Sequence, residues 1–331
     1  GLGSRLRIGG PAPAPQDGLR RWLERLSLDL IHFPTPTPPH PHEHVPYVVP
    51  PLLDVPAPHV VTVHDVQELH FPEYFSPAQR AVRATHHWEA LYKARRVIVS
   101  YDHVKADLLK YFGLPETKVS VCPIPNRSIS LREPTAVAAR AYDEKYRSWQ
   151  PFLLYPAQTW PHKNHRRLLQ ALRSVREGHD TDLRLICTGH HDDRRAEVLA
   201  QVEALGLGGA VLFTGVVPED ELCWLYRHTA LVTIPTEYEA GSFPLLEAMM
   251  LGAPVICSDV TSLPETIGDR RFVFSPHDAR EMSELILRVL TDAGLREANV
   301  ANSTRQAARL REVDAAAYLY DAYGRALRGA S

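Results

Sequence analysis

The sequence has few cysteines and no long apolar run, and these absences exclude several classes of protein. Its four cysteines lie far apart in apolar stretches, without the close spacing of a zinc site or a disulfide framework. No stretch reaches the ~18 consecutive apolar residues of a membrane span, and the start does not resemble a signal peptide. We therefore expect a cytoplasmic protein without a transmembrane segment, whose contact with a membrane, if any, is peripheral and at the inner face.

A surplus of charge of one sign is also lacking. The 331 residues carry 39 acidic against 37 basic side chains, a formal net charge of −2. Such a balance provides no global field for nucleic acid and no polybasic anchor. Nucleic acid is therefore not an expected partner, and an anionic ligand must be bound by local groups.

Residues 34–51 are rich in proline and histidine. Proline at this density cannot form a helix or a central strand, so the segment is expected to be an extended loop. His40, His42 and His44 alternate within it and could present imidazoles to a metal, but only Glu43 adds an acid nearby. We expect a solvated loop and predict no metal site.

What is present is a regular alternation of short apolar runs and helical patterns, which predicts a parallel α/β sheet. The length favours two domains, and the apolar periodicity weakens between Arg127 and Gln150. Strands are expected from Asp29, from His59, and over 97–100, 119–121, 152–155, 183–188, 211–213, 231–234 and 255–258; helices are expected over 80–94, 102–112, 164–177, 194–204, 219–228 and 244–251.

Two acids, Glu239 and Glu247, stand eight positions apart around a glycine, a serine and a proline. Pro244 suits the first position of a helix, and Gly252 ends that helix two turns later. Carboxylates accept the hydrogen bonds that vicinal sugar or ribose hydroxyls donate, and free amides at the helix start add donors. The residues alone leave two interpretations open: a cradle for a hydroxyl-rich ligand, or surface glutamates flanking a helix start.

The spacing Glu239-x7-Glu247, with Gly241 and Pro244 between the acids, resembles the donor-site motif of the retaining glycosyltransferases of family 4, the glycosyl transferases group 1. The resemblance extends over most of the chain. Further matching segments are His64-Asp65, Lys163-Asn164, Gly215-x3-Glu219-x2-Leu222, Gly252-x-Pro254-Val255-Ile256 and Asp259-x4-Pro264-Glu265.

The resemblance implies a GT-B fold, in which two Rossmann-like, doubly wound parallel-sheet domains face a cleft. It assigns residues 1–135 to an N-terminal acceptor-side domain, 136–150 to a linker and 151–312 to a nucleotide-sugar-binding domain. Residues 313–331 are then a terminal helix that crosses back to the first domain. Only twenty-eight residues precede Asp29, so the N-terminal domain is expected to be shortened.

The resemblance also implies roles for single residues. It assigns the ribose to Glu247, the transferred sugar to Glu239, the diphosphate to Lys163 and a sugar contact from the acceptor side to His64. For Lys163 an ordinary basic helix start, and for His64 a strand-end histidine bonded to a carbonyl, remain the alternatives. The expected catalytic residues are His64, Lys163 and Glu239; the expected donor-binding residues are Gln158, Lys163, Arg166, Gly189, Gly215, Gly241, Ser242, Phe243 and Glu247.

One position departs from the family pattern. Relatives commonly carry an arginine five residues before the lysine, where this chain has Gln158. A neutral amide cannot replace a guanidinium charge on a diphosphate. Three interpretations are open: Arg166 or His162 compensates, catalysis relies more on Lys163 and helix amides, or the enzyme is slow. We expect compensation.

The implied activity is transfer of a hexose, with mannose and glucose as candidates, from a UDP- or GDP-sugar to a glycan or lipid-linked acceptor. The family transfers with retention and needs neither a cofactor nor a metal, and the adjacent Asp192-Asp193 pair is expected to be a solvated turn. Bacterial polysaccharide assembly is the expected context, and the oligomeric state is open. Two alternatives remain: a weak or inactive scaffold that binds nucleotide-sugar or a partner subunit, and an epimerase or phosphorylase on the same fold.

Overall fold

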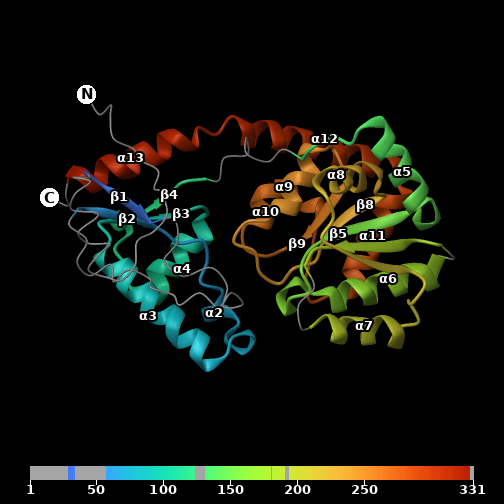
Figure 1. The fold of residues 1–331 in the computed structure, drawn as a ribbon, viewed down its shortest axis with the longest axis horizontal. Coiled ribbons are helices and arrows are strands. Elements are labelled where there is room, and N and C mark those ends of the chain that lie inside the picture. Colours follow the sequence, from blue (N-terminus) through green and yellow to red (C-terminus); the bar gives the residue numbers. More distant parts are fainter. Residues whose placement is uncertain (1–28, 34–56, 124–130, 180, 191–193, 329–331) are drawn as a thin grey trace. The chain divides into compact units, whose positions relative to one another are not determined.

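The structure is a computed structural model that describes residues 29–33, 57–123, 131–179, 181–190 and 194–328. The chain divides into two compact units, one comprising residues 1–124 and 314–331 and the other residues 125–313. The histidines at 40, 42 and 44 and the pair Asp192-Asp193 lie outside the described residues. We describe each unit by itself (Figure 1).

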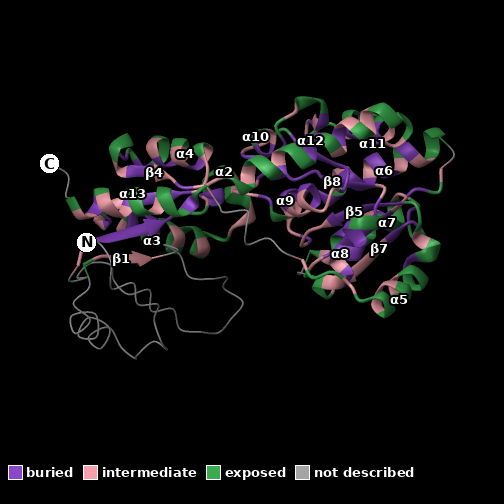
Figure 2. Cartoon of the chain, turned by 90° about the horizontal axis from the view of Figure 1, so that it is seen from above, coloured by how far each residue is buried: buried purple, intermediate pink, exposed green. Residues whose placement is uncertain are grey.

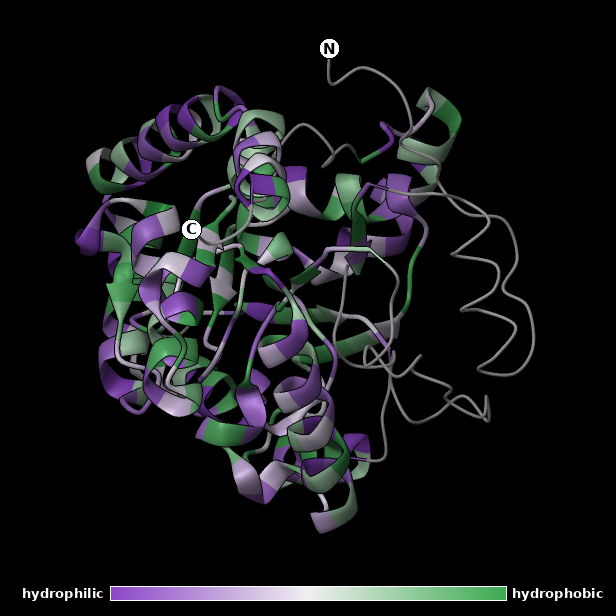
Figure 3. Ribbon diagram, turned by 90° about the vertical axis from the view of Figure 1, so that its left-hand side faces the viewer, coloured by the Kyte–Doolittle hydropathy of each residue, from purple (hydrophilic) through white to green (hydrophobic). Residues whose placement is uncertain are grey.

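The second unit is built on a six-stranded parallel sheet in the order β10-β9-β8-β5-β6-β7. Its central strands are mostly apolar and nearly all of their residues are buried, as expected of a sheet covered on both faces. Figure 3 colours the chain by hydropathy, with hydrophobic residues in green. The strands are β5 (Phe152–Pro156), β6 (Arg184–Thr188), β7 (Val211–Gly215), β8 (Leu231–Ile234), β9 (Val255–Ser258) and β10 (Val273–Phe274).

Helices cover this sheet, and their buried residues, purple in Figure 2, belong to the same hydrophobic core as those of the strands. In α6, Leu168, Leu172 and Val175 are buried at helical spacing. The predicted parallel α/β sheet is confirmed, although the short strand β10 was not predicted. The helices are α6 (His165–His179), α7 (Arg195–Ala204), α8 (Glu219–His228), α9 (Phe243–Met250), α10 (Leu263–Ile267), α11 (Ala279–Thr291) and α12 (Ala293–Arg311), with 3₁₀ turns at Pro161–Lys163 (η6) and Arg270–Phe272 (η7).

Residues 136–150, expected to be a linker, instead form α5 (Ala136–Tyr146) and a 3₁₀ turn (Arg147–Trp149) within the second unit. The buried ring of Tyr146 stacks on Trp224 of α8 at 5.4 Å between centroids, and its hydroxyl donates to Glu221. The indole nitrogen of Trp224 donates to Asp143 at 3.1 Å. Aromatic and charged contacts therefore replace the aliphatic stripe that would have identified this helix in the sequence.

The first unit has a four-stranded parallel sheet in the order β1-β2-β3-β4. The C-terminal helix α13 (Ala315–Arg328) packs on β2 and β3 of this unit, and the ring of His32 hydrogen-bonds the Tyr323 hydroxyl at 2.7 Å. The other elements are β1 (Ile31–Phe33), β2 (His59–Thr62), β3 (Arg96–Val99), β4 (Val119–Val121), α2 (Gln67–His70), α3 (Pro77–Lys93) and α4 (Asp102–Phe112), with 3₁₀ turns at Pro72–Tyr74 and Glu116–Lys118.

Two negative findings apply to the described residues. Among them, no helix combines the length and the apolar character that crossing a bilayer requires. Nor do three or more of their His, Cys, Asp and Glu side chains gather in a way that could hold a metal ion.

A buried asparagine completes the edge of β9 in the second unit. The side chain of Asn299 on α12 accepts from the Val255 amide and donates to the Val255 carbonyl, both at 2.8 Å. Strand β10 pairs with β9 only from Cys257 onward. Asn299 therefore takes the place of a neighbouring strand at Val255.

Replacing Asn299 with alanine should leave both polar groups of Val255 unpaired in the core. We expect Asn299→Ala to lower the free energy of unfolding by about 2–4 kcal/mol, measured by denaturant titration. Thr304→Ala, on an exposed position of the same helix, is the control and should change it by less than about 0.5 kcal/mol. Equal losses in the two variants would contradict this account.

Candidate active site

The site lies where the strand order of the second sheet reverses. Strands β5 and β8 are neighbours, while β6 and β7 extend the sheet to one side and β9 and β10 to the other. In such sheets the loops that follow the two central strands diverge and leave a crevice at their carboxyl ends. Here those loops are the segments 157–164, after β5, and 235–242, after β8.

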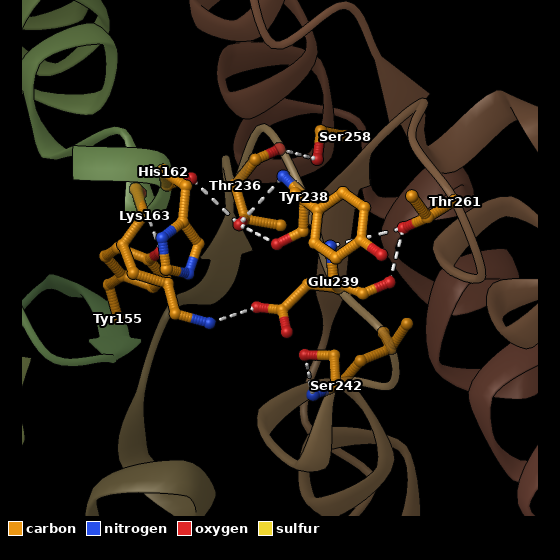
Figure 4. A network of polar contacts seen from close by, with 10 residues as sticks. Tyr155, His162, Lys163, Thr236, Tyr238, Glu239, Ser242, Ser258 and Thr261 are labelled. Carbon is orange, nitrogen blue, oxygen red and sulfur yellow. Dashed lines mark hydrogen bonds and ion pairs between the residues drawn. The ribbon is translucent and has the colours of Figure 1, made fainter. Parts of the chain in front are cut away.

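Each of these two loops contributes one charged side chain, and the two charges pair. Lys163 ends the turn η6 and Glu239 lies in the loop after β8. Their side chains meet with 2.6 Å between Nζ and Oε1, and they are 17% and 11% exposed (Figure 4). Two residues that the sequence predicts as catalytic are thus in direct contact.

Asn164 and Tyr155 hold the lysine in place. Asn164 adopts a left-handed conformation, with φ of 58°, which ends η6 and starts α6. Its buried amide donates to the carbonyls of Pro235 and Pro276, both at 2.8 Å. The hydroxyl of Tyr155 donates to the Lys163 carbonyl at 2.7 Å. The lysine backbone is therefore tied to both β5 and the loop after β8.

Three hydroxyl groups hold the glutamate loop (Figure 4). The buried Thr236 hydroxyl lies 3.0 Å from the His162 carbonyl and 2.8 Å from that of Tyr238. Ser258, at the end of β9, donates to the Thr236 carbonyl at 2.6 Å. Thr261 both accepts from the Glu239 amide at 3.2 Å and donates to the Glu239 carbonyl at 2.6 Å.

The second acid, Glu247, lies on α9, one helical turn beyond the start of that helix. Ser242 caps the helix, its hydroxyl accepting from the Leu245 amide at 3.4 Å. Tyr226 of α8 donates to a carboxylate oxygen of Glu247 at 2.7 Å. Burial raises the pKa of Glu247, and the Tyr226 hydrogen bond opposes that rise. The acid is held by a buried phenol, as a ligand-binding carboxylate on a rigid helix would be.

Two glycines lie beside the loop after β5. Gly189 follows β6 with φ of 129°, and its amide donates to the Gly215 carbonyl at 3.0 Å. A Cβ there would come within 2.8 Å of the Ala157 carbonyl oxygen and 3.1 Å of the Gln158 amide. Only glycine fits this approach, so Gly189, Gly215 and Gln158 come together at the carboxyl ends of β5, β6 and β7.

The other predicted residues differ in their surroundings. Gly241 and Ser242 lead into α9, and the Phe243 side chain is 52% exposed. Arg166 is exposed on α6. His64 belongs to the first unit, where it is exposed just after β2.

His162 cannot supply the charge that Gln158 lacks. Its side chain is buried, and burial together with the neighbouring Lys163 charge lowers its pKa to about 3. The imidazole is therefore neutral near pH 7. A neutral imidazole favours Arg166 over His162 as the compensating residue.

Sequence reasoning missed two residues of the site, Tyr226 and Thr261. Each acts through one hydroxyl from a neighbouring element, which leaves no periodic or spacing signal. The only hint was positional, because Thr261 falls within the segment Asp259-x4-Pro264 that resembles the family.

Residues 142–308, which contain the paired charges and Glu247, match the family model of the glycosyl transferases group 1, and residues 3–125 match that of glycosyltransferase family 4. The chain belongs to the glycosyl transferases group 1 family. The sequence-based identification is thereby confirmed.

Among curated relatives of this glycosyltransferase family member is the O-antigen chain mannosyltransferase B of Escherichia coli, 29% identical over 75% of the chain and 65% of that protein. A serotype-specific mannosyltransferase WbdA of the same organism is 26% identical over 67% of the chain and 28% of its own length. The chain thus spans less than two thirds of either relative.

Solved structures agree on the fold. The structure of WaaG, a glycosyltransferase involved in lipopolysaccharide biosynthesis, matches with a TM-score of 0.67 and 21% identity, covering 91% of this chain and 80% of that one. Sucrose-phosphate synthase from Thermosynechococcus elongatus matches with a TM-score of 0.70 and 20% identity, covering 95% and 76%.

A second buried histidine makes stability depend on pH. His165 packs against Tyr155 with 4.9 Å between ring centroids, and neither of its ring nitrogens has a hydrogen-bond partner among the described residues. Burial and the charge of Lys163 lower its pKa from 6.5 to about 3. The unfolded chain therefore binds a proton below pH 6.5 that the folded chain does not, so the contribution of neutral His165 is complete above pH 6.5 and is lost as pH falls toward 3.

We expect His165→Phe to reduce the slope of unfolding free energy against pH by about 1.4 kcal/mol per unit between pH 6 and 4. Denaturant titrations at several pH values measure this slope. His179→Phe, at an exposed position of the same helix, is the control. An unchanged slope in His165→Phe would show that this histidine is protonated in the folded state.

Proposed function

We propose that this chain transfers a hexose from a nucleoside-diphosphate sugar to a hydroxyl of a glycan or lipid-linked acceptor, with retention of configuration and without a metal. The observation that carries the proposal is the ion pair of Lys163 and Glu239 at the reversal of strand order, with Glu247 on the adjoining helix. A cation and two acceptor-only carboxylates match the diphosphate and the two hydroxyl-bearing rings of such a donor.

In this proposal the lysine binds the diphosphate and the two acids bind the rings. When the diphosphate reaches Lys163, Glu239 loses its partner and its carboxylate turns to accept hydrogen bonds from the sugar. Glu247, already oriented by Tyr226, accepts from the ribose. Gln158, Arg166, Gly189, Gly215, Gly241, Ser242 and Phe243 complete the donor site.

During transfer, the bond from the sugar C1 to the diphosphate oxygen breaks and a bond from C1 to the acceptor oxygen forms on the same face. The acceptor proton passes to the departing diphosphate. The diphosphate gains negative charge as it leaves, and Lys163 stabilises this charge. We assign to His64 a contact with the sugar from the acceptor side.

Mannose and glucose are the first sugars to test. The curated relatives named above are mannosyltransferases, and a structure with 18% identity and a TM-score of 0.64, covering 81% of this chain and 71% of its own, is that of Anabaena HepE with UDP and glucose. GDP-mannose and UDP-glucose are therefore the two donors to compare. Lipid-linked acceptors would imply peripheral membrane contact at the cytoplasmic face.

A second candidate function is binding without turnover. Two features favour it: Gln158 stands where relatives commonly carry arginine, and His162 is neutral. Incubation with each donor, followed by measurement of free nucleoside diphosphate, separates the two. We expect release of UDP or GDP by the chain; calorimetric binding without any release would replace the transferase with a binding protein.

Substitutions of Glu247 and Glu239 should have different effects on nucleotide binding and on the choice of sugar. Glu247→Gln should weaken binding of the nucleoside diphosphate by about tenfold or more, because the ribose contact is lost. Glu239→Gln should bind the nucleoside diphosphate at least as tightly as the wild type, since Lys163 loses its counter-ion, but should discriminate poorly between sugars.

Calorimetry with UDP and GDP, and initial rates with both donors, measure these effects. Glu265→Gln, an exposed acid in the first turn of α10, is the matched control and should behave as the wild type. Equal weakening of nucleotide binding in Glu239→Gln and Glu247→Gln would overturn the separate roles.

A further inference from the structure

Thr261 holds the main chain of Glu239 at two points. Its hydroxyl accepts a hydrogen bond from the Glu239 amide at 3.2 Å and donates one to the Glu239 carbonyl at 2.6 Å (Figure 4). A single hydroxyl thus uses both its donor and its acceptor capacity on one residue. The contact joins two loops, because Thr261 follows β9 while Glu239 follows β8.

The backbone of Thr261 is itself unusual. Its φ is 47°, in the left-handed region that β-branched residues rarely occupy. Such a conformation persists only where the surroundings impose it, and it is concentrated at functional sites. In the part of the chain that the structure describes, the only other non-glycine residue with positive φ is Asn164. Both therefore adjoin the ion pair: Asn164 follows Lys163, and Thr261 bonds Glu239.

The ion pair needs this support on the glutamate side. Lys163 is fixed through Asn164 and Tyr155, whereas Glu239 lies in an irregular loop, four residues before the first residue of α9. Thr261 holds the amide and the carbonyl of Glu239, while the carboxylate of Glu239 pairs with Lys163. Its carboxylate can then exchange Lys163 for another partner while the main chain stays in place.

We propose that Thr261 is a positioning residue, which fixes the main chain of Glu239 and so sets where its carboxylate meets the transferred sugar. This rests on the proposed function. A residue that acts in this way should affect turnover and the choice of sugar but not nucleotide binding, because the ribose acid Glu247 is held independently by Tyr226.

Three variants test the proposal. Thr261→Val keeps the branched shape and removes the hydroxyl, and Thr261→Ser keeps the hydroxyl. Thr229→Val is the matched control: its buried hydroxyl also bonds main-chain groups, those of Phe152 and Leu231, but it precedes β8 at the opposite end of that strand.

We expect Thr261→Val to lower kcat about tenfold or more and to reduce the kcat/KM ratio between the two sugar donors, with nucleoside-diphosphate affinity within about threefold of the wild type. Thr261→Ser should restore kcat to within about threefold. Thr229→Val should lower the melting temperature but leave kcat and the donor ratio unchanged. An unchanged kcat in a folded Thr261→Val protein, or an equal loss in Thr229→Val, would overturn the proposal.

Crystal structures of the wild type and Thr261→Val test positioning without activity. We expect the Nζ to Oε1 distance, 2.6 Å in the wild type, to lengthen and the Glu239 main chain to shift in the variant. An unmoved Glu239 would reject the role of Thr261 even in an active enzyme. If the wild type releases no nucleoside diphosphate, the transferase function is rejected instead. The two crystal structures would still show whether the Glu239 main chain shifts in Thr261→Val, so the positioning role is tested separately.

Discussion

The pairing of β5 with β8 is the constraint on which the rest of the second unit depends. The two strands are separated in sequence by two strands and three helices, yet they lie side by side, so the sheet grows outward from them in both directions. This one register brings the loops at 157–164 and 235–242 to the same edge. Without it, Lys163 and Glu239 would be surface charges on separate loops.

The ion pair of Lys163 and Glu239 is the state of the site without a ligand, and it is not a main source of stability. Removing two charges from water costs much of what their attraction returns, so a buried pair adds little net stability compared with apolar side chains of the same size. Stability instead comes from apolar strands and from satisfied polar groups such as those bonded by Asn164 and Asn299. A lysine already paired with a carboxylate admits only a ligand that can replace that carboxylate.

Much of this architecture follows from the sequence, because continuous apolar runs such as Leu231–Ile234 and Val255–Ser258 have few alternatives to a buried parallel strand. Local patterns do not reveal tertiary contacts. Helix α5 is held by aromatic rings without an aliphatic stripe, and β10 is only two residues long. The neutrality of His162 depends on burial by residues distant in sequence, and Thr261 acts through a contact with a separate loop. The sequence therefore indicated the two charged side chains that pair, Lys163 and Glu239, but not the contacts that hold them.

The first unit can be completed only after the second unit has been synthesised, because its helix α13 follows the second unit in the sequence. It packs on β2 and β3, and Tyr323 bonds His32 across 291 positions of sequence. During synthesis this helix leaves the ribosome only after the whole second unit, which can fold as a continuous segment by then. The strands of the first unit must therefore wait for α13, and until it is made Val60 and Ile98 lack the cover of Ala322 and Ala326. At that stage the second unit can be folded while the sheet of the first unit still lacks its helix, so chaperones would bind the first unit and not the second.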